Sequence, residues 1–188
     1  MTHYKDGTFS LVETGTEGDL WDIYGTPDGH VYTGGWDYLK GIGNFLHIYQ
    51  DQVDRIDKPE LIYNNAKENA TALAVYTTND TLYACCGNGI YVQSVRDTSH
   101  WRVIEWNTIA EHFGQIKAMR GAGDNNIFAA GYFGTIMHYN GKSWKMLTEF
   151  DKTNNTVFFA ASVTKNHVYI AGGDGNTYKA VIYVGTLH

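Results

Sequence analysis

The stretch NNIFAAGYFGTIMHYNGKSWKML, residues 125–147, decides the fold of this chain. It holds an apolar strand, a glycine turn, a second apolar strand, an Asn-Gly turn and a third strand that begins with Trp144. Asn-Gly between apolar runs is a strong signal for a tight β-hairpin turn. The segment therefore predicts an antiparallel meander, and the next question is whether it recurs.

Three related segments occur elsewhere in the chain: HVYTGGWD at 30–37, TLYACCGNG at 81–89 and HVYIAGGDG at 167–175, to be compared with NIFAAGYFG at 126–134. Each reads polar, aliphatic, aromatic, two or three small residues, then a turn. A short apolar strand precedes each copy, and a third strand and an outer strand with Trp101 or Trp144 follow the central copies. Repeats of about 40–50 residues with four antiparallel strands are typical of β-propeller blades.

We therefore predict an all-β fold: one four-bladed β-propeller domain, with four antiparallel strands in each blade. The blades are predicted at about 16–63, 64–109, 110–150 and 151–188. The last lacks an outer strand, and THYKDGTFSLV at 2–12 resembles MHYNGKSWKML at 137–147. Residues 1–15 are expected to supply the missing strand and close the ring, which removes a sheet edge. A dimer whose two chains build one eight-bladed ring is the alternative.

The third repeat resembles a short propeller repeat of many bacterial and phage-associated proteins of unknown role. Those repeats read approximately Asp-Val-Phe-Ala-Val-Gly, a loop, Gly-Thr-Ile-Leu-His-Tyr, Asp-Gly and Trp. The other three repeats match it loosely, and together the four span nearly the whole chain. The size is also similar to that of four-bladed hemopexin-like domains, without a hemopexin motif. The resemblance implies a propeller fold and transfers no catalytic residue, because a fold does not dictate a function.

Composition excludes several classes of protein. Hydrophobic residues make up 43% and charged residues 18% of the chain, as in globular domains. The net charge of −6 gives a nucleic-acid partner no electrostatic support. No apolar run is long enough for a membrane span, and the first fifteen residues hold no apolar leader, so a non-secreted, cytoplasmic location is expected. The adjacent Cys85 and Cys86 suit a reducing compartment and occupy small-residue positions, where we expect neighbouring sheets to pack closely.

Propellers place their sites at a mouth of the central channel, so the candidates are the loops between the second and third strands of each blade and the loops from each outer strand to the next inner strand. The first blade has the longest of these loops, near residues 36–44. Exposed aromatics beside carboxylates would suit stacking on a sugar with hydrogen bonds to its hydroxyls; the alternative is that they cap the core between blades. The candidate ligand-binding residues are Trp36, Asp37, Tyr38, His112, Tyr132 and Asp174.

The inner strands are expected to line the channel with Asp22, Lys117 and Arg120. One carboxylate and two cations could hold an anion or water, or form a structural polar plug. A cation site would need several inward oxygen ligands, and Asp22 is the one obvious candidate. The metal ligands are therefore left undefined, and no cofactor is expected.

Enzyme motifs such as G-x-S-x-G, H-E-x-x-H and the P-loop are absent from the sequence, and its eight histidines are scattered. We predict a non-catalytic binding module for a protein or a glycan, with a monomer favoured. A hydrolase or lyase is the alternative; it would need Asp37 and Asp174 to converge and one carboxyl group with a raised pKa. An assembly protein is the third possibility and would show an exposed apolar patch.

Overall fold

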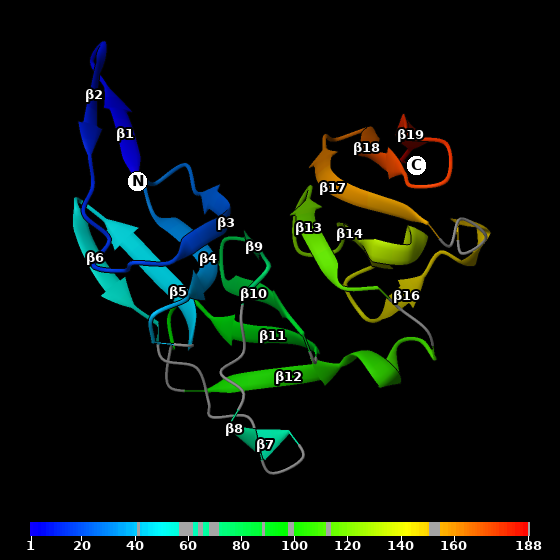
Figure 1. Cartoon of the computed structure of the whole chain (residues 1–188), viewed down its shortest axis with the longest axis horizontal. Helices are drawn as coiled ribbons and strands as arrows, with labels where there is room; N and C mark the ends of the chain where they lie inside the picture. The colour runs from blue at the N-terminus through cyan, green and yellow to red at the C-terminus, as the bar shows by residue number, and fades with distance from the viewer. Residues whose placement is uncertain are drawn as a thin grey trace. The chain divides into compact units, whose positions relative to one another are not determined.

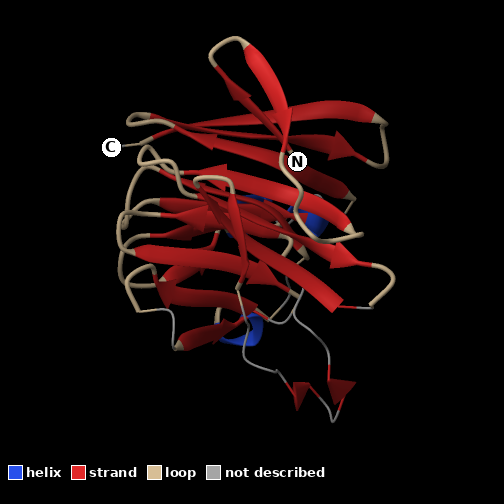
Figure 2. Cartoon of the chain, turned by 90° about the vertical axis from the view of Figure 1, so that its left-hand side faces the viewer, coloured by secondary structure: helices blue, strands red, loops and turns tan. Residues whose placement is uncertain are grey.

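The computed structural model describes residues 1–40, 42–56, 62–63, 66–67, 72–87, 89–97, 100–111, 114–150 and 155–187. It confirms an all-β fold built from several antiparallel sheets (Figures 1 and 2). The chain divides into two compact units, Met1–Ala72 and Leu73–His188. Each unit is described by itself below.

The first unit is built around one four-stranded sheet with a hairpin on either side of it in the sequence. The N-terminal hairpin pairs β1 (Thr2–Lys5) with β2 (Thr8–Leu11). The sheet has the order β3 (Asp19–Gly25), β4 (Val31–Asp37), β5 (Ile42–Tyr49) and β6 (Gln52–Arg55). A short hairpin of β7 (Ile62–Tyr63) and β8 (Ala66–Lys67) follows.

The second unit contains three sheets, one for each remaining repeat (Figure 1). The first has β9 (Ala74–Thr77), β10 (Thr81–Cys86), β11 (Gly89–Ser94) and β12 (Trp101–Glu105). The next has β13 (Ile116–Gly121), β14 (Ile127–Gly131), β15 (Ile136–Tyr139) and β16 (Trp144–Met146). The last has β17 (Thr156–Val163), β18 (His167–Asp174) and β19 (Lys179–Thr186), and 3-10 turns occur at Trp106–Thr108, Tyr132–Gly134 and Thr148–Phe150.

The segment 125–147 folds as its sequence predicts. β14, β15 and β16 form a meander, and the Asn-Gly turn joins the last two strands. The Asn140 side-chain oxygen accepts hydrogen bonds from the backbone N–H groups of Lys142 and Ser143, both at 3.0 Å. Gly141 has a φ of 86°, a left-handed conformation that glycine adopts without strain. The turn chemistry therefore comes directly from the two residues that signalled it.

The ends of the chain differ from the simplest expectation. The N-terminal segment pairs with itself, as Thr2 lies opposite Leu11 and Lys5 opposite Thr8. The last sheet has three strands, and β19 pairs with β18 alone in the described part of the chain. The closure of a ring by residues 1–15, the count of four blades and the predicted blade boundaries therefore stay predictions.

A repeated backbone feature explains the small residues at the end of the second strand of each repeat. Gly35, Gly131 and Gly172 each lie opposite an irregularity in the inner strand, where the register shifts by one residue. A Cβ atom on any of them would lie within 2.0 Å of an inner-strand carbonyl oxygen. Cys86 occupies the equivalent position in the second repeat, and the described β9–β10 register ends one residue before it, at the pair Cys85 and Ala74. The need for glycine thus comes from a β-bulge within the same sheet.

This result corrects our explanation of the small residues in part. We expected the neighbouring sheet to limit side-chain size at both cysteine positions. At the position before the bulge, a Cβ on Gly34 would lie 2.6 Å from the Cβ of Ala72, a residue outside the described strands, so the packing of a neighbouring sheet there stays a prediction. At Gly35, Gly131 and Gly172, the equivalents of Cys86, side-chain size is limited instead by the segment opposite within the same sheet. Cys85 and Cys86 are both buried thiols.

Gly131→Ala is expected to destabilise the protein by about 1–3 kcal/mol, because the new methyl group would collide with the Gln115 carbonyl oxygen of the bulge. Chemical denaturation monitored by circular dichroism measures the change. Cys86→Ala is the matched control at the same repeat position, where the protein already has a Cβ atom, and it should cost clearly less. Equal losses for the two variants would contradict the bulge explanation.

Candidate functional site

The turns between the second and third strands of three repeats each expose one aromatic side chain. We call them the aromatic turns: residues 38–40 between β4 and β5, 132–135 between β14 and β15, and 175–178 between β18 and β19. Their exposed members are Tyr38, Phe133 and Tyr178, with exposed fractions of 61%, 58% and 93%. Large aromatic side chains are usually mostly buried, so a recurring exposed one at one repeat position points to recognition.

Two of these aromatics are held in an unfavourable backbone conformation. Phe133 has a φ of 56° and Tyr178 a φ of 57°, both in the left-handed region. A bulky side chain with a Cβ atom pays about 1–2 kcal/mol there, and glycine or asparagine would avoid the strain. Strained residues of this kind persist where the surrounding structure enforces them, and they cluster at functional sites.

The hydrogen bonds that enforce the strain are local. At Phe133, the Gly131 N–H donates to the Thr135 carbonyl at 3.0 Å and the Thr135 N–H to the Tyr132 carbonyl at 3.1 Å. At Tyr178, its own N–H donates to the Asp174 carbonyl at 2.8 Å. Both turns are also tied to the residue before the inner strand of their sheet, since the Tyr132 N–H donates to Gln115 and the Gly175 N–H to Asn155. The aromatic side chains are therefore presented by rigid turns.

Asp37 and Asp174, predicted to contact a ligand, both accept hydrogen bonds within their own turns, and their contact with a ligand stays a prediction. The Asp37 carboxylate is buried, and its Oδ1 accepts hydrogen bonds from the backbone N–H groups of Leu39 and Lys40 at 3.1 and 3.0 Å. Its Oδ2 lies 3.5 Å from the Lys40 ammonium. Asp174 Oδ1 accepts from the N–H groups of Asn176 and Thr177 at 2.8 and 3.3 Å.

These hydrogen bonds keep both carboxyl groups ionised. The Lys40 N–H lowers the pKa of Asp37, and the Asn176 N–H lowers the pKa of Asp174. A general acid would need the opposite shift, a carboxyl pKa raised towards neutrality. The two residues thus have the electrostatics of turn-capping groups.

The remaining candidates fall into separate places. Trp36 is half-buried in the β3–β4–β5 ladder, and the Tyr38 hydroxyl donates to Asp19 Oδ2 at 3.0 Å. Asp22 lies in the first unit, where its Oδ1 accepts from the Ile23 N–H at 3.0 Å. His112 lies outside the described residues.

In the second unit, the structure brings Lys117 and Tyr132 together. The Lys117 ammonium lies 5.4 Å from the centroid of the Tyr132 ring, a cation–π contact, and burial lowers the pKa of the lysine. Arg120 donates to the carbonyls of Val75 at 3.2 Å and Met119 at 2.6 Å, and so ties β13 to β9. Arg120 therefore has the contacts of a structural residue, whereas Lys117 and Tyr132 lie beside the exposed Phe133.

Sequence reasoning missed Tyr178, and the cause is a strand boundary. The turn was placed at Gly173–Gly175, whereas β18 continues to Asp174 and the reversal takes residues 175–178. Asp174 pairs with Lys179, so Tyr178 is the last residue of the turn, directly before β19. The sequence signal that could have found it is Asn-Thr-Tyr-Lys between two apolar strands.

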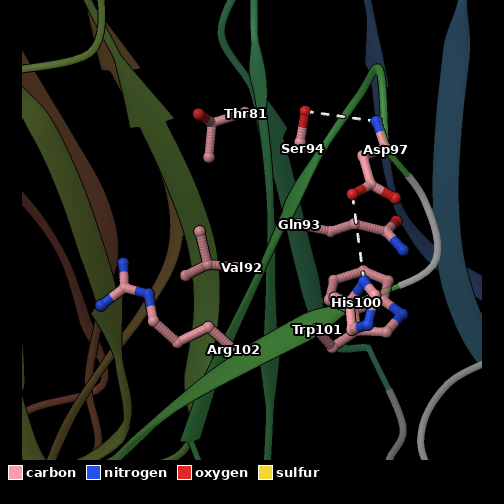
Figure 3. A pocket seen from close by; sticks show the side chains of 8 residues that line it. All are labelled: Thr81, Val92, Gln93, Ser94, Asp97, His100, Trp101 and Arg102. Carbon is pink, nitrogen blue, oxygen red and sulfur yellow. Dashed lines mark hydrogen bonds and ion pairs between the residues drawn. The ribbon is translucent and has the colours of Figure 1, made fainter.

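A groove of about 350 Å³ lies where β10 and β12 begin and β11 ends, and Figure 3 shows the side chains that line it. Trp101 meets the Tyr91 ring edge-on, at 6.1 Å between centroids. His100 Nδ1 lies 3.9 Å from Asp97 Oδ2 on the same rim. Ser94 Oγ accepts from the Asp97 N–H at 3.3 Å. These polar groups hold the connection between β11 and β12, so the groove is less suited to a ligand than the aromatic turns.

A stacked histidine pair occupies the first unit. His30 Nδ1 and His47 Nε2 are 2.7 Å apart, which is a hydrogen bond that shares one proton between the rings. The Tyr32 ring stacks on His47 and the Tyr49 ring on His30. Burial and the neighbouring His30 lower the pKa of His47, while Asp54 opposes this shift.

Within the described residues, no group of three or more His, Cys, Asp and Glu side chains is arranged to hold a metal ion. In the same part of the chain, no helix is long and apolar enough to span a membrane.

Comparison with protein-family models and with curated proteins finds no match. Solved structures do match. YCF48 bound to D1 peptide is 11% identical with a TM-score of 0.68 over 96% of this chain and 54% of that one. YCF48 from Cyanidioschyzon merolae is 14% identical with a TM-score of 0.60, over 94% and 59%. The RRP9 WD40 repeats are 11% identical with a TM-score of 0.57, over 90% and 52%. The fold is therefore β-propeller-like, and the chain spans between half and three fifths of the length of these three structures.

Phe133→Gly is expected to leave the free energy of unfolding unchanged or to raise it by up to about 1 kcal/mol, because relief of the left-handed strain offsets the lost ring and the extra backbone entropy. Urea denaturation measures the change. Phe158→Gly is the contrasting variant, since Phe158 is fully buried, and it should lose about 3 kcal/mol or more. A comparable loss at Phe133 would show that its ring supports the fold.

Acidification is expected to destabilise the protein through His47. Its folded-state pKa lies below the ordinary value, so the unfolded chain binds more protons in that range and stability falls as the pH drops through about 6.5 towards the lowered pKa. The free energy of unfolding should therefore be larger at about pH 7.5 than at about pH 5. His47→Gln should reduce this difference, and an unchanged difference would contradict the assignment.

Proposed function

We propose that this chain is a non-catalytic binding module that binds a segment of another protein at the aromatic turns. The observation that carries the proposal is the pair Phe133 and Tyr178, two exposed rings that rigid turns hold in a conformation that costs stability. Because both rings are mostly exposed, their burial within the chain offsets little of this strain, and contact with a ligand would offset more of it. Rigid, exposed aromatic side chains are also the usual hot spots of protein interfaces.

A protein ligand is favoured over a glycan by the state of the polar groups. Sugar recognition needs carboxylates and amides that can bond to hydroxyls beside the aromatic ring. At the Tyr178 turn, Asp174 binds two backbone N–H groups, and the Asn176 oxygen accepts from the Asn155 amide at 2.8 Å. That YCF48 has been solved with a bound peptide shows that a similar fold can take such a ligand.

The enzyme alternative has no support from the pKa values of its two candidate carboxylates, Asp37 and Asp174. A hydrolase or lyase built on Asp37 and Asp174 would require at least one protonated carboxyl group near neutral pH. Both residues have lowered pKa values, and in both the Oδ1 atom accepts backbone hydrogen bonds from its own turn. The binding proposal uses neither carboxylate as a reactive group.

The architecture around the site is part of the same proposal. The sheets are inferred to close into a propeller ring, as the resemblance to short bacterial and phage-associated repeats also implies. An assembly role is the second candidate, and a specific observation favours it: one face of the last sheet is apolar and exposed.

Binding is tested with an array of immobilised random 15-residue peptides, probed with the fluorescently labelled chain. Peptides that bind should lose about 10- to 30-fold in affinity when Phe133→Gly and Tyr178→Asn are combined, because hot-spot aromatics contribute about 2 kcal/mol. Both substitutions suit a left-handed backbone and preserve the turns.

Tyr4→Ser is the matched control for this experiment. Tyr4 is also an exposed aromatic, and it belongs to the N-terminal hairpin and to none of the aromatic turns. Its affinity for the same peptides should be unchanged. Equal affinities for the wild type and the combined variant would overturn the proposed site, and binding to a sugar panel in place of peptides would favour the glycan alternative.

A further inference from the structure

The last sheet of the second unit has an exposed apolar face. We call it the forward face and define it by Tyr169 and Ala171 on β18 and by Ile182 and Val184 on β19. The register places Tyr169 opposite Val184 and Ala171 opposite Ile182, so the four side chains point to the same side. Ile182 is 68% exposed, Val184 62% and Tyr169 40%. Contiguous apolar surface of this kind marks an interaction site.

The preceding sheet shows what normally covers such a face. Its equivalent positions are Phe128 opposite His138 and Ala130 opposite Ile136. Phe128, Ala130 and Ile136 are all buried in one cluster.

The other half of that cluster comes from the opposite side of the last sheet, its backward face. Phe158, Val168 and Ile170 are its buried members, and Val181 and Tyr183 pack beside them. Each forward face is thus built to receive the backward face of another sheet, and within the second unit the last forward face receives none.

The first sheet of the chain has a matching backward face. By register, Leu20 corresponds to Phe158, Val31 to Val168 and Thr33 to Ile170, because each pair lies opposite equivalent residues. Ile23, opposite Thr33, is 49% exposed, Leu20 and Val31 are half-buried, and Thr33 is itself buried, so Ile23, Leu20 and Val31 are the members that a partner can contact. All of these side chains are uncharged, as are those of the forward face, so the two faces can meet without burying an unpaired charge.

We propose that the forward face of the last sheet packs on the backward face of the first sheet of a second copy of this chain. Two-fold symmetry then makes the contact twice and closes one ring from two chains. The comparisons favour a second copy because nearly the whole chain matches only about half of longer propeller-like chains, including one composed of WD40 repeats. A second copy supplies the sheets that the other half of such a ring requires.

The first experiment measures the mass of the 188-residue chain by sedimentation equilibrium over a range of concentrations. The wild type should approach twice its 21.1 kDa mass. Ile182→Lys should raise the dissociation constant of the dimer at least about tenfold, because dimerisation would bury the new charge. Tyr178→Lys adds the same charge at an exposed position outside the forward face and should leave the mass unchanged. Ile182 is exposed in the single chain, so its substitution should also leave the circular dichroism spectrum unchanged.

The second experiment identifies the partner surface. Chains carrying Ile182→Cys are mixed with chains carrying Ile23→Cys and oxidised; a disulfide-linked dimer of the two variants is expected, since the native cysteines are buried. A monomeric wild type at all concentrations overturns the proposal, as does a dimer that Ile182→Lys leaves intact. An intrachain disulfide in a monomer that carries both substitutions overturns it in favour of a ring closed by the chain's own first sheet.

Discussion

The close approach of a glycine to a bulged inner strand is the constraint on which the rest of each sheet depends. At Gly35, Gly131 and Gly172 the inner-strand carbonyl occupies the place of a side chain. The bulge adds one residue to the inner strand and increases its local twist. The second strand ends at the glycine itself in β14 and two residues after it in β4 and β18, so the aromatic turns follow closely after this contact between two backbones.

The order of dependence runs from the backbone to the surface. The turn follows the bulge closely in the sequence, and backbone hydrogen bonds close it, such as those around Thr135 and Asp174. Carboxylates at Asp37 and Asp174 cap the turns because their oxygens accept adjacent N–H groups. The Phe133 and Tyr178 rings face solvent, whereas the Tyr38 hydroxyl also donates a hydrogen bond to Asp19. The chemistry of the two solvent-facing rings is therefore free to vary without loss of the turn.

Much of the fold could be predicted because its signals are local. The recurrence of an aliphatic–aromatic pair before small residues located every second strand, and Asn140-Gly141 located a hairpin turn. The candidate site could be predicted only in part. Tyr38 and Tyr132 lie where the repeat pattern put them, but the pattern does not distinguish a carboxylate that faces a ligand from one that caps its own turn, as at Asp37. Tyr178 was missed because strand length depends on pairing with β19, and left-handed backbone angles at Phe133 leave no trace in composition. The closure of a ring is harder still to predict, because it depends on which sheet surface packs against the last sheet of the chain.

The second repeat carries Cys86 where the other three carry glycine. In those three sheets a Cβ atom at this position would lie within 2.0 Å of a carbonyl oxygen of the segment opposite. Because Cys86 has a Cβ atom, the backbone opposite it must follow a different path. The residue at this position and the segment opposite it, which are apart in the sequence, must therefore change together when one repeat diverges from another.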